Sequence, residues 1–258
     1  MSATPGLSAW ILRSARISPA AAVHLAVRCT GFTGFARLER AVPRSGAILD
    51  LGCGHGLLAL LAASREPARE VLGIDLLEER LDVARRVAAR HGLRNVCFER
   101  RSILDLPEGP FAAVVVADVL FYLPREAQRQ VLERAASRLA PGGRLVVKEQ
   151  VRAPAWKAWM VETQERLAYA LRVGFGLFRG WGEVVTPDVH LWGSAELAAL
   201  LRSFDLEVRD ERLDRFSYLS HHLFVGTFCS SLSPPVAAST AFPAEKQNVP
   251  PTSALPGR

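Results

Sequence analysis

The strongest constraint on the fold of this chain is an alternation, between Ala47 and Val151, of short apolar runs with longer segments of helical period. Short apolar runs bounded by turn residues predict buried strands, and a 3.6-residue period predicts helices. Alternation of this kind is typical of a parallel sheet with helices on both faces. The pattern predicts strands at 47–53, 70–76, 95–100, 111–120 and 143–151.

Helices are predicted between these strands at 56–64, 78–92 and from Pro124 to about Leu139. Beyond residue 193, the pattern predicts a helix over 194–204 with Ser194 as its N-cap. Two last strands, at 206–214 and 220–228, are predicted to form a hairpin at the sheet edge. The strand at 111–120 is so uniformly apolar that both of its faces should be covered.

Composition sets broad limits on the class of protein. The chain has 258 residues and a formal charge of +6, and its four cysteines form no CxxC pair. We therefore expect no disulfide frame, no metal site and a reducing, cytoplasmic location. The charge could suit a polyanion, but the arginines are scattered along many helices, which favours a solvated surface. No run of about 18 apolar residues predicts a transmembrane span.

Three glycines at alternate positions, Gly52, Gly54 and Gly56, follow the first predicted strand in "ILDLGCGHG". In α/β sheets, ligands bind beyond the carboxyl ends of the strands. Glycine there permits a positive φ and close approach of a ligand to the backbone. Asp75 ends the second strand, at the position where an acid can accept hydrogen bonds from ribose hydroxyls; pairing with Arg80 is the purely structural alternative. The GxGxG spacing argues against a dinucleotide, and a loop without lysine argues against a Walker site.

These motifs, with "VLGIDLLEERLDVARR", "FERRSILDLP", "FAAVVVADVLFYLP" and "LAPGGRLVVKE", resemble the motif series of class I S-adenosylmethionine-dependent methyltransferases over residues 46 to 151. The resemblance implies an α/β fold, a doubly wound, Rossmann-like sheet of seven strands, mostly parallel with an antiparallel edge strand. It also implies S-adenosyl-L-methionine as cofactor. The late pair of strands would supply the last hairpin of that sheet.

Carried over by position, the resemblance implies a set of cofactor-binding residues. The loop Gly52, Cys53, Gly54 and Gly56 would lie against methionine and ribose, with Asp50 near the amino group. Asp75, with Leu76 beside it, would hold the ribose. Ser102 stands where the family usually has an acid for the adenine amino group, and Ile103 would pack on the adenine ring. Asp118, with Val119 and Leu120, would line the methyl-bearing end.

The resemblance also divides the chain. We expect an N-terminal helical cap at 1–45, the cofactor-binding core at 46–151, its C-terminal part at 194–229 and a disordered Ser/Pro-rich tail at 230–258. The segment 152–193 carries Trp156, Trp159 and Trp181 and is expected to be an insertion or lid over the acceptor pocket, or a helix packed on the sheet edge. Apolar and basic residues at 10–17 could also touch a membrane surface.

Methyl transfer requires a base only when the nucleophile starts protonated. His190 and Tyr122 are predicted as catalytic residues, with His221, His222 and Asp118 as further candidates by type, although a loop or structural role for these histidines is the alternative. "ADVLFYLP" lacks the (D/N/S)PP(Y/F) motif of enzymes that methylate base amines, so a hydrophobic small molecule is the predicted acceptor, methylated at oxygen, nitrogen or carbon. RNA methylation, a catalytically silent binding module and a nicotinamide oxidoreductase are the alternatives.

Overall fold

A single sheet of seven strands forms the centre of the molecule. The computed structural model describes residues 35–152, 159, 163, 166, 189–213 and 220–229. The strands lie in the order β3-β2-β1-β4-β5-β7-β6. Their bounds are β1 (Gly46–Leu51), β2 (Arg69–Asp75), β3 (Val96–Arg100), β4 (Phe111–Ala117), β5 (Leu139–Gln150), β6 (Leu206–Arg212) and β7 (His221–Phe228). β7 runs antiparallel to β5 and β6, which confirms the mostly parallel seven-stranded prediction and the late hairpin.

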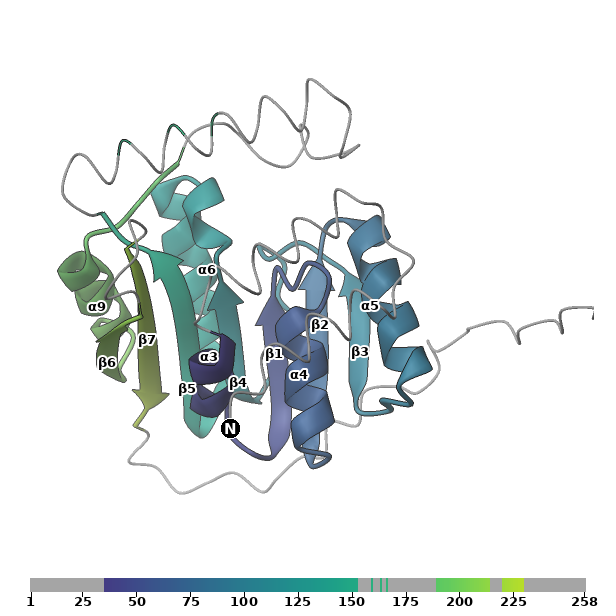
Figure 1. Ribbon diagram of the computed structural model, residues 1–258. Helices are drawn as coiled ribbons and strands as arrows, with labels where there is room; N and C mark the ends of the chain where they lie inside the picture. Colours follow the sequence, from purple (N-terminus) through teal and green to yellow (C-terminus); the bar gives the residue numbers. More distant parts are fainter. Residues whose placement is uncertain are drawn as a thin grey trace, which may run out of the picture.

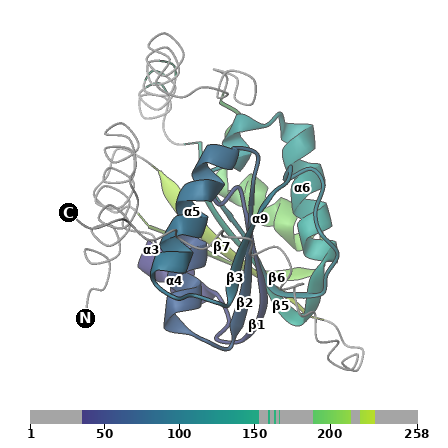
Figure 2. The same cartoon turned by 90° about the vertical axis from the view of Figure 1, so that its right-hand side faces the viewer.

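Helices cover both faces of this sheet (Figures 1 and 2). α3 (Phe35–Ala41), α4 (Leu57–Arg65) and α5 (Glu78–Arg90) lie on one face; α6 (Arg125–Ser137) and α9 (Ser194–Arg202) lie on the other. A 3-10 turn, η1 (Leu120–Tyr122), joins β4 to α6. Each face has its own buried apolar cluster, because alternate residues of the central strands point to opposite sides.

Several boundaries differ from the sequence-based prediction, and three of the differences have clear local causes. β4 ends at Ala117 rather than at residue 120, because Asp118 takes a φ of 55° and leaves the ladder. β5 starts at Leu139, which pairs with Phe111 before a register shift, so the predicted "APGG" turn lies inside an irregular strand. The N-cap of α9 is Gly193, not Ser194, and its N–H donates to Glu196 Oε2 at 3.0 Å.

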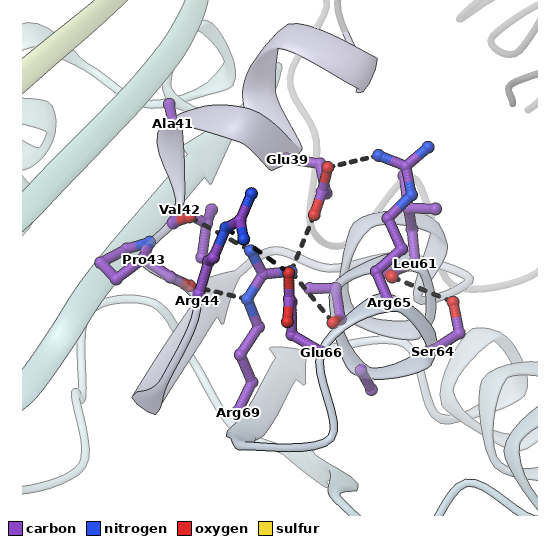
Figure 3. Close-up of polar contacts among 12 residues, drawn as sticks. Glu39, Ala41, Val42, Pro43, Arg44, Leu61, Ser64, Arg65, Glu66 and Arg69 are labelled. Atoms are coloured by element: carbon purple, nitrogen blue, oxygen red, sulfur yellow. Dashed lines mark hydrogen bonds and ion pairs between the residues drawn. The ribbon is translucent and has the colours of Figure 1, made fainter. Parts of the chain in front are cut away.

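A buried arginine fixes α3 against α4 and the amino end of β2 (Figure 3). The Arg69 side chain is buried and its Nη1 lies 2.9 Å from Glu39 Oε1, while Arg65 pairs with the second oxygen of Glu39. The guanidinium also donates to three backbone carbonyls, those of Val42, Pro43 and Ala62. We call Glu39, Arg65 and Arg69 the Arg69 cluster; it joins three elements at the end of the sheet opposite to the glycine loop.

Several predicted segments lie outside the described residues. They are most of the N-terminal cap (1–34), most of the predicted lid (153–188, except 159, 163 and 166) and the tail (230–258). The predicted membrane-contact segment at 10–17 belongs to the first of these. Within the described residues, no helix has the length and apolar character needed to cross a bilayer.

Candidate active site

The glycine loop connects the carboxyl end of β1 to α4 at the edge where the parallel strands end (Figure 1). Gly52, Gly54 and Gly56 have φ values of 64°, 56° and 73°, a region that L side chains rarely adopt. The Cys53 N–H donates to Ile74 O at 3.0 Å, which ties the loop to β2. The predicted tight turn with positive φ angles is therefore present.

The three glycines have different neighbours. A Cβ on Gly52 would lie 2.8 Å from Val119 Cγ2, and one on Gly56 would lie 2.7 Å from Phe98 Cε1. A Cβ on Gly54 would meet only Arg80 Nη1, at 3.8 Å, within a 4 Å radius. Gly52 and Gly56 are thus required by protein packing, whereas Gly54 leaves backbone open to a ligand.

Asp75 closes the loop from the neighbouring strand. Its Oδ2 accepts from Gly54 N–H and its Oδ1 from Leu77 N–H, both at 2.9 Å. A carboxylate has about four acceptor positions, so each oxygen keeps one for another donor. The side chain is held rigidly at the end of β2 with acceptor capacity left, which fits a ligand diol.

Asp50 is a buried carboxyl below the loop. Burial raises its pKa to about 7, an amide hydrogen bond from Ala59 opposes the rise, and the charge of Asp75 adds to it. Its Oδ2 has no hydrogen-bond partner among the described residues. A buried carboxyl of this kind is stabilised by a cationic partner, so an ammonium group of a ligand fits it. Burial, with the charges of Asp50 and Asp75, also raises the pKa of the Cys53 thiol, which is therefore neutral.

The predicted adenine contacts follow β2 and β3. Ser102 Oγ accepts from Leu104 N–H at 3.1 Å, so part of its acceptor capacity is used in a local turn. Ile103 is buried, and Leu76 is exposed at the end of β2. The apolar side chains of Leu76 and Ile103 can cover a flat ring, while Ser102 offers one weak polar contact.

Charged side chains gather where β4 and β5 end. Lys148 Nζ and Asp118 Oδ2 form an ion pair at 2.5 Å, with the Lys148 side chain 1% and that of Asp118 9% exposed. Glu149 Oε1 accepts the N–H groups of Val119 and Leu120, at 2.9 and 2.8 Å, and so holds the turn after β4. Burial first and then the charge of Asp118 raise the pKa of Glu149 to about 8. Glu149 Oε2 has no hydrogen-bond partner among the described residues.

The two predicted catalytic residues belong to neighbouring segments. His190 N–H donates to Phe121 O at 2.9 Å, and Gln128 Nε2 donates to His190 O, also at 2.9 Å. These bonds fix the backbone of residue 190 beside η1, which contains Tyr122. The catalytic roles of His190 and Tyr122 stay predictions.

Sequence reasoning did not select Lys148, Glu149 or Gln150. The available signal was the triplet "KEQ" at the end of the apolar strand "GRLVVKEQV", because consecutive charged or polar residues are rarely buried unless paired. His221 was named only as one of several histidines. Its ring lies across β5 from Asp118, with Nε2 3.6 Å from Oδ1.

Comparison with known proteins identifies the family. Residues 48–143 match the family model of a methyltransferase domain. A ubiquinone biosynthesis O-methyltransferase of Xanthomonas axonopodis pv. citri is 33% identical over 178 residues, which cover 68% of this chain and 67% of the relative. A demethylmenaquinone methyltransferase of Thermus thermophilus is 41% identical over 114 residues, 43% of this chain and 49% of the relative.

Solved structures show the same fold at lower identity. An O-methyltransferase family protein from Burkholderia thailandensis superimposes with a TM-score of 0.61 at 23% identity, over 82% of this chain and 60% of that one. A geranyl diphosphate methyltransferase in complex with GPP and sinefungin gives a TM-score of 0.57 at 15% identity, over 75% and 76%. The chain belongs to the S-adenosylmethionine-dependent methyltransferases, and S-adenosylmethionine is its cofactor.

Proposed function

We propose that this methyltransferase acts on the oxygen of a hydroxyl group carried by a hydrophobic ring, of the kind found in precursors of isoprenoid quinones. The observation that carries the proposal is the 33% identity, over two thirds of both chains, to an O-methyltransferase of ubiquinone biosynthesis. The demethylmenaquinone methyltransferase relative belongs to a related chemistry. A ring carbon is the second candidate for the methylated atom.

Within this proposal, the cofactor is held by residues of the carboxyl edge. Asp50 receives the amino group, the open backbone at Gly54 receives the chain and ribose, and Asp75 accepts the ribose hydroxyls. The loop itself is shaped by Gly52, Cys53 and Gly56. The adenine is flanked by Leu76, Ser102 and Ile103. Asp118 lies next to the methyl group that is transferred. When bound, the cofactor supplies an electrophilic methyl group on a sulfonium. The protein then has to orient the acceptor oxygen in line, exclude water and remove a proton.

A panel of acceptors tests the proposal with a methyl-labelled cofactor. Catechols and hydroquinones with isoprenoid tails of increasing length are compared with tail-free analogues and with total RNA. We expect O-methylated ring products, identified by mass spectrometry and NMR, and a KM that falls as the tail lengthens because apolar area is buried. Transfer to RNA, or to ring carbon alone, would replace the proposal with one of the alternatives. No transfer to any acceptor despite cofactor binding would favour a silent binding module.

A further inference from the structure

A second polar group lies beside the cofactor loop, on the face of the sheet that carries α3, α4 and α5. It consists of Asp118, Lys148, Gln150 and His221, which we call the Asp118 cluster. Lys148 and Gln150 alternate along β5 and share this face with Val146, while His221 is opposite Gln150 in the β5–β7 register. Each of the three strand residues is at most 9% exposed.

The cluster has the features of a site for a polar ligand group. Asp118 holds a φ of 55°, a conformation that is costly for a residue other than glycine, and both of its carboxylate oxygens face cations or cationisable groups. Gln150 Oε1 is buried and has no hydrogen-bond partner among the described residues. A buried carbonyl oxygen without a donor is destabilising, and a hydroxyl from a ligand would remove that penalty.

The cluster also adjoins the cofactor site. Val119, the next residue after Asp118, lies so close to the glycine loop that a Cβ on Gly52 would be 2.8 Å from its Cγ2. Asp118 itself is tied to β5 by its N–H, which donates to Lys148 O at 2.9 Å. An acceptor oxygen in front of the ends of β4 and β5 would therefore have the cofactor loop on one side and His221 on the other.

We propose that His221 is the catalytic base that takes the proton of the acceptor hydroxyl, with Asp118 and Lys148 as positioning residues. Gln150 accepts a hydrogen bond from a second hydroxyl on the acceptor ring, as in a catechol. This inference rests on the proposed O-methylation. A carboxylate beside an imidazole orients the ring and stabilises its protonated form. Lys148 Nζ pairs with that carboxylate and fixes it in a buried place.

The reaction balances without a further reactant. The acceptor oxygen gives its proton to the His221 imidazole and forms a bond to the methyl carbon. The methyl–sulfur bond breaks as that bond forms, and its electron pair stays on sulfur, which becomes a neutral thioether. The proton leaves the imidazole for solvent after the products depart.

Charged groups of several elements bear on the His221 ring. Asp118 follows β4 and Lys148 comes from β5, both on the His221 face. Glu149 points to the other face of β5, and on β6 the register sets Arg212 opposite His222 rather than His221. A base must be unprotonated to act. The rate of methylation of an un-ionised phenol should therefore rise with pH as the His221 imidazole loses its proton.

The test replaces His221 by Gln and uses the adjacent histidine as a matched control. His222 lies on the same strand but on the opposite face, where its Nδ1 is 2.7 Å from Asp210 Oδ1. With an isoprenoid catechol as acceptor, His221→Gln should lower kcat by about 100-fold or more and flatten the acid limb of the pH profile. His222→Gln should stay within about twofold of the intact protein, since it removes no group near the reaction.

A readout that needs no turnover uses 4-nitrocatechol, whose anion is distinguished from its neutral form by absorbance. Bound to the intact protein below its solution pKa, it should show the anion spectrum, and His221→Gln should abolish this shift while His222→Gln keeps it. Asp118→Asn provides a second variant should His221→Gln fail to fold. Removal of the carboxylate should move the acid limb to lower pH and weaken the spectral shift, because the protonated ring loses its partner.

Three outcomes separate the possibilities. If His221→Gln lowers the rate equally for ionised and un-ionised acceptors and leaves the bound spectrum unchanged, His221 has only a structural role and the inference is overturned. If His190→Gln, rather than His221→Gln, removes the acid limb, the base is His190. If the intact protein methylates none of these acceptors while still binding the cofactor by calorimetry, the proposed function itself fails.

Discussion

Two sets of buried polar side chains lie at opposite ends of the sheet and differ in how completely their atoms are paired. In the Arg69 cluster, Arg69 donates to Glu39 and to three carbonyls, and no buried side-chain atom of the cluster lacks a partner among the described residues. At the carboxyl end, Asp50 Oδ2, Glu149 Oε2 and Gln150 Oε1 have none. The first set is complete within the protein; the second leaves atoms for a ligand.

The difference is informative because both sets carry the same costs of burial. A buried polar atom without a partner costs about 1–3 kcal/mol, so a fold keeps one only where another function requires it. The pKa values agree with this contrast, since burial raises those of Asp50 and Glu149 to about 7 and about 8. Perturbed groups of this kind concentrate at functional sites.

We expect the largest effect from breaking the Arg69 cluster, whose buried side-chain atoms all have partners within the protein. Arg69→Ala leaves Glu39 buried with Arg65 as its remaining partner, and loss of one member of a buried ion pair costs about 3–5 kcal/mol. Urea denaturation should show this loss in the free energy of unfolding, while the folded fraction binds the cofactor normally. Arg44→Ala is the control, because its side chain is 89% exposed and its pair with Glu66 should contribute under about 0.5 kcal/mol. A similar small loss for both variants would show that the Arg69 cluster does not anchor the fold.

At the carboxyl end, Asp75→Ala should act on the ligand rather than on folding. The variant removes charged acceptors, and a hydrogen bond to a charged group contributes about 1.5–3 kcal/mol, which corresponds to roughly 10- to 150-fold weaker cofactor binding. Calorimetric titration with S-adenosylmethionine and its demethylated product measures this change. Asp82→Ala, in an exposed ion pair on α5, should leave the affinity unchanged. Equal affinity for the Asp75 variant and the intact protein would remove Asp75 from the cofactor site.

The two sets also differ in how far the sequence could predict them. The glycine loop and Asp75 could be found because each is a local signal at the end of a predicted strand. The Asp118 cluster could not, because the contact between Asp118 and His221 depends on β7 inserting between β5 and β6 in one particular register. The Arg69 cluster likewise joins residues 30 positions apart, Glu39 and Arg69. Sequence patterns fix periodicity, whereas long-range pairing decides which buried charges meet.

The pH dependence of stability should come from the buried carboxyl groups at the carboxyl end of the sheet, and Glu149 shows the expected direction. The folded pKa of Glu149 is raised from 4.5 to about 8, so the native state keeps a proton that the unfolded state loses. Its contribution is therefore fully present below pH 4.5 and is lost as pH rises to about 8. Glu149→Gln stays neutral and keeps an oxygen for the amides of Val119 and Leu120. Its unfolding free energy should exceed that of the intact protein by at least about 1 kcal/mol at pH 8, with the difference fading toward pH 5.

Denaturation series between pH 5 and 8 measure this difference. Glu108→Gln is the matched control, because the Glu108 side chain is 80% exposed in its pair with Arg138. It should leave the pH dependence unchanged. Parallel curves for Glu149→Gln and the intact protein would mean that Glu149 is ionised in the folded state, and the contrast between the two ends of the sheet would then rest on Asp50 and Gln150 alone.

We expect the smallest effect from a change at Ser102, within the candidate cofactor site. Ser102 lies at the carboxyl end of the sheet, yet its hydroxyl accepts a hydrogen bond from Leu104 N–H. In this respect it resembles the Arg69 cluster, whose polar atoms are paired within the protein. A neutral hydrogen bond contributes about 0.5–1.5 kcal/mol, and that part of its value is already used in the turn. Ser102→Ala should therefore weaken cofactor binding by no more than about threefold and lower stability by under about 1 kcal/mol. A loss as large as that for Asp75→Ala, measured in the same titration, would show that Ser102 Oγ holds the adenine amino group strongly. Position at the carboxyl end, rather than unused bonding capacity, would then mark the ligand-binding residues.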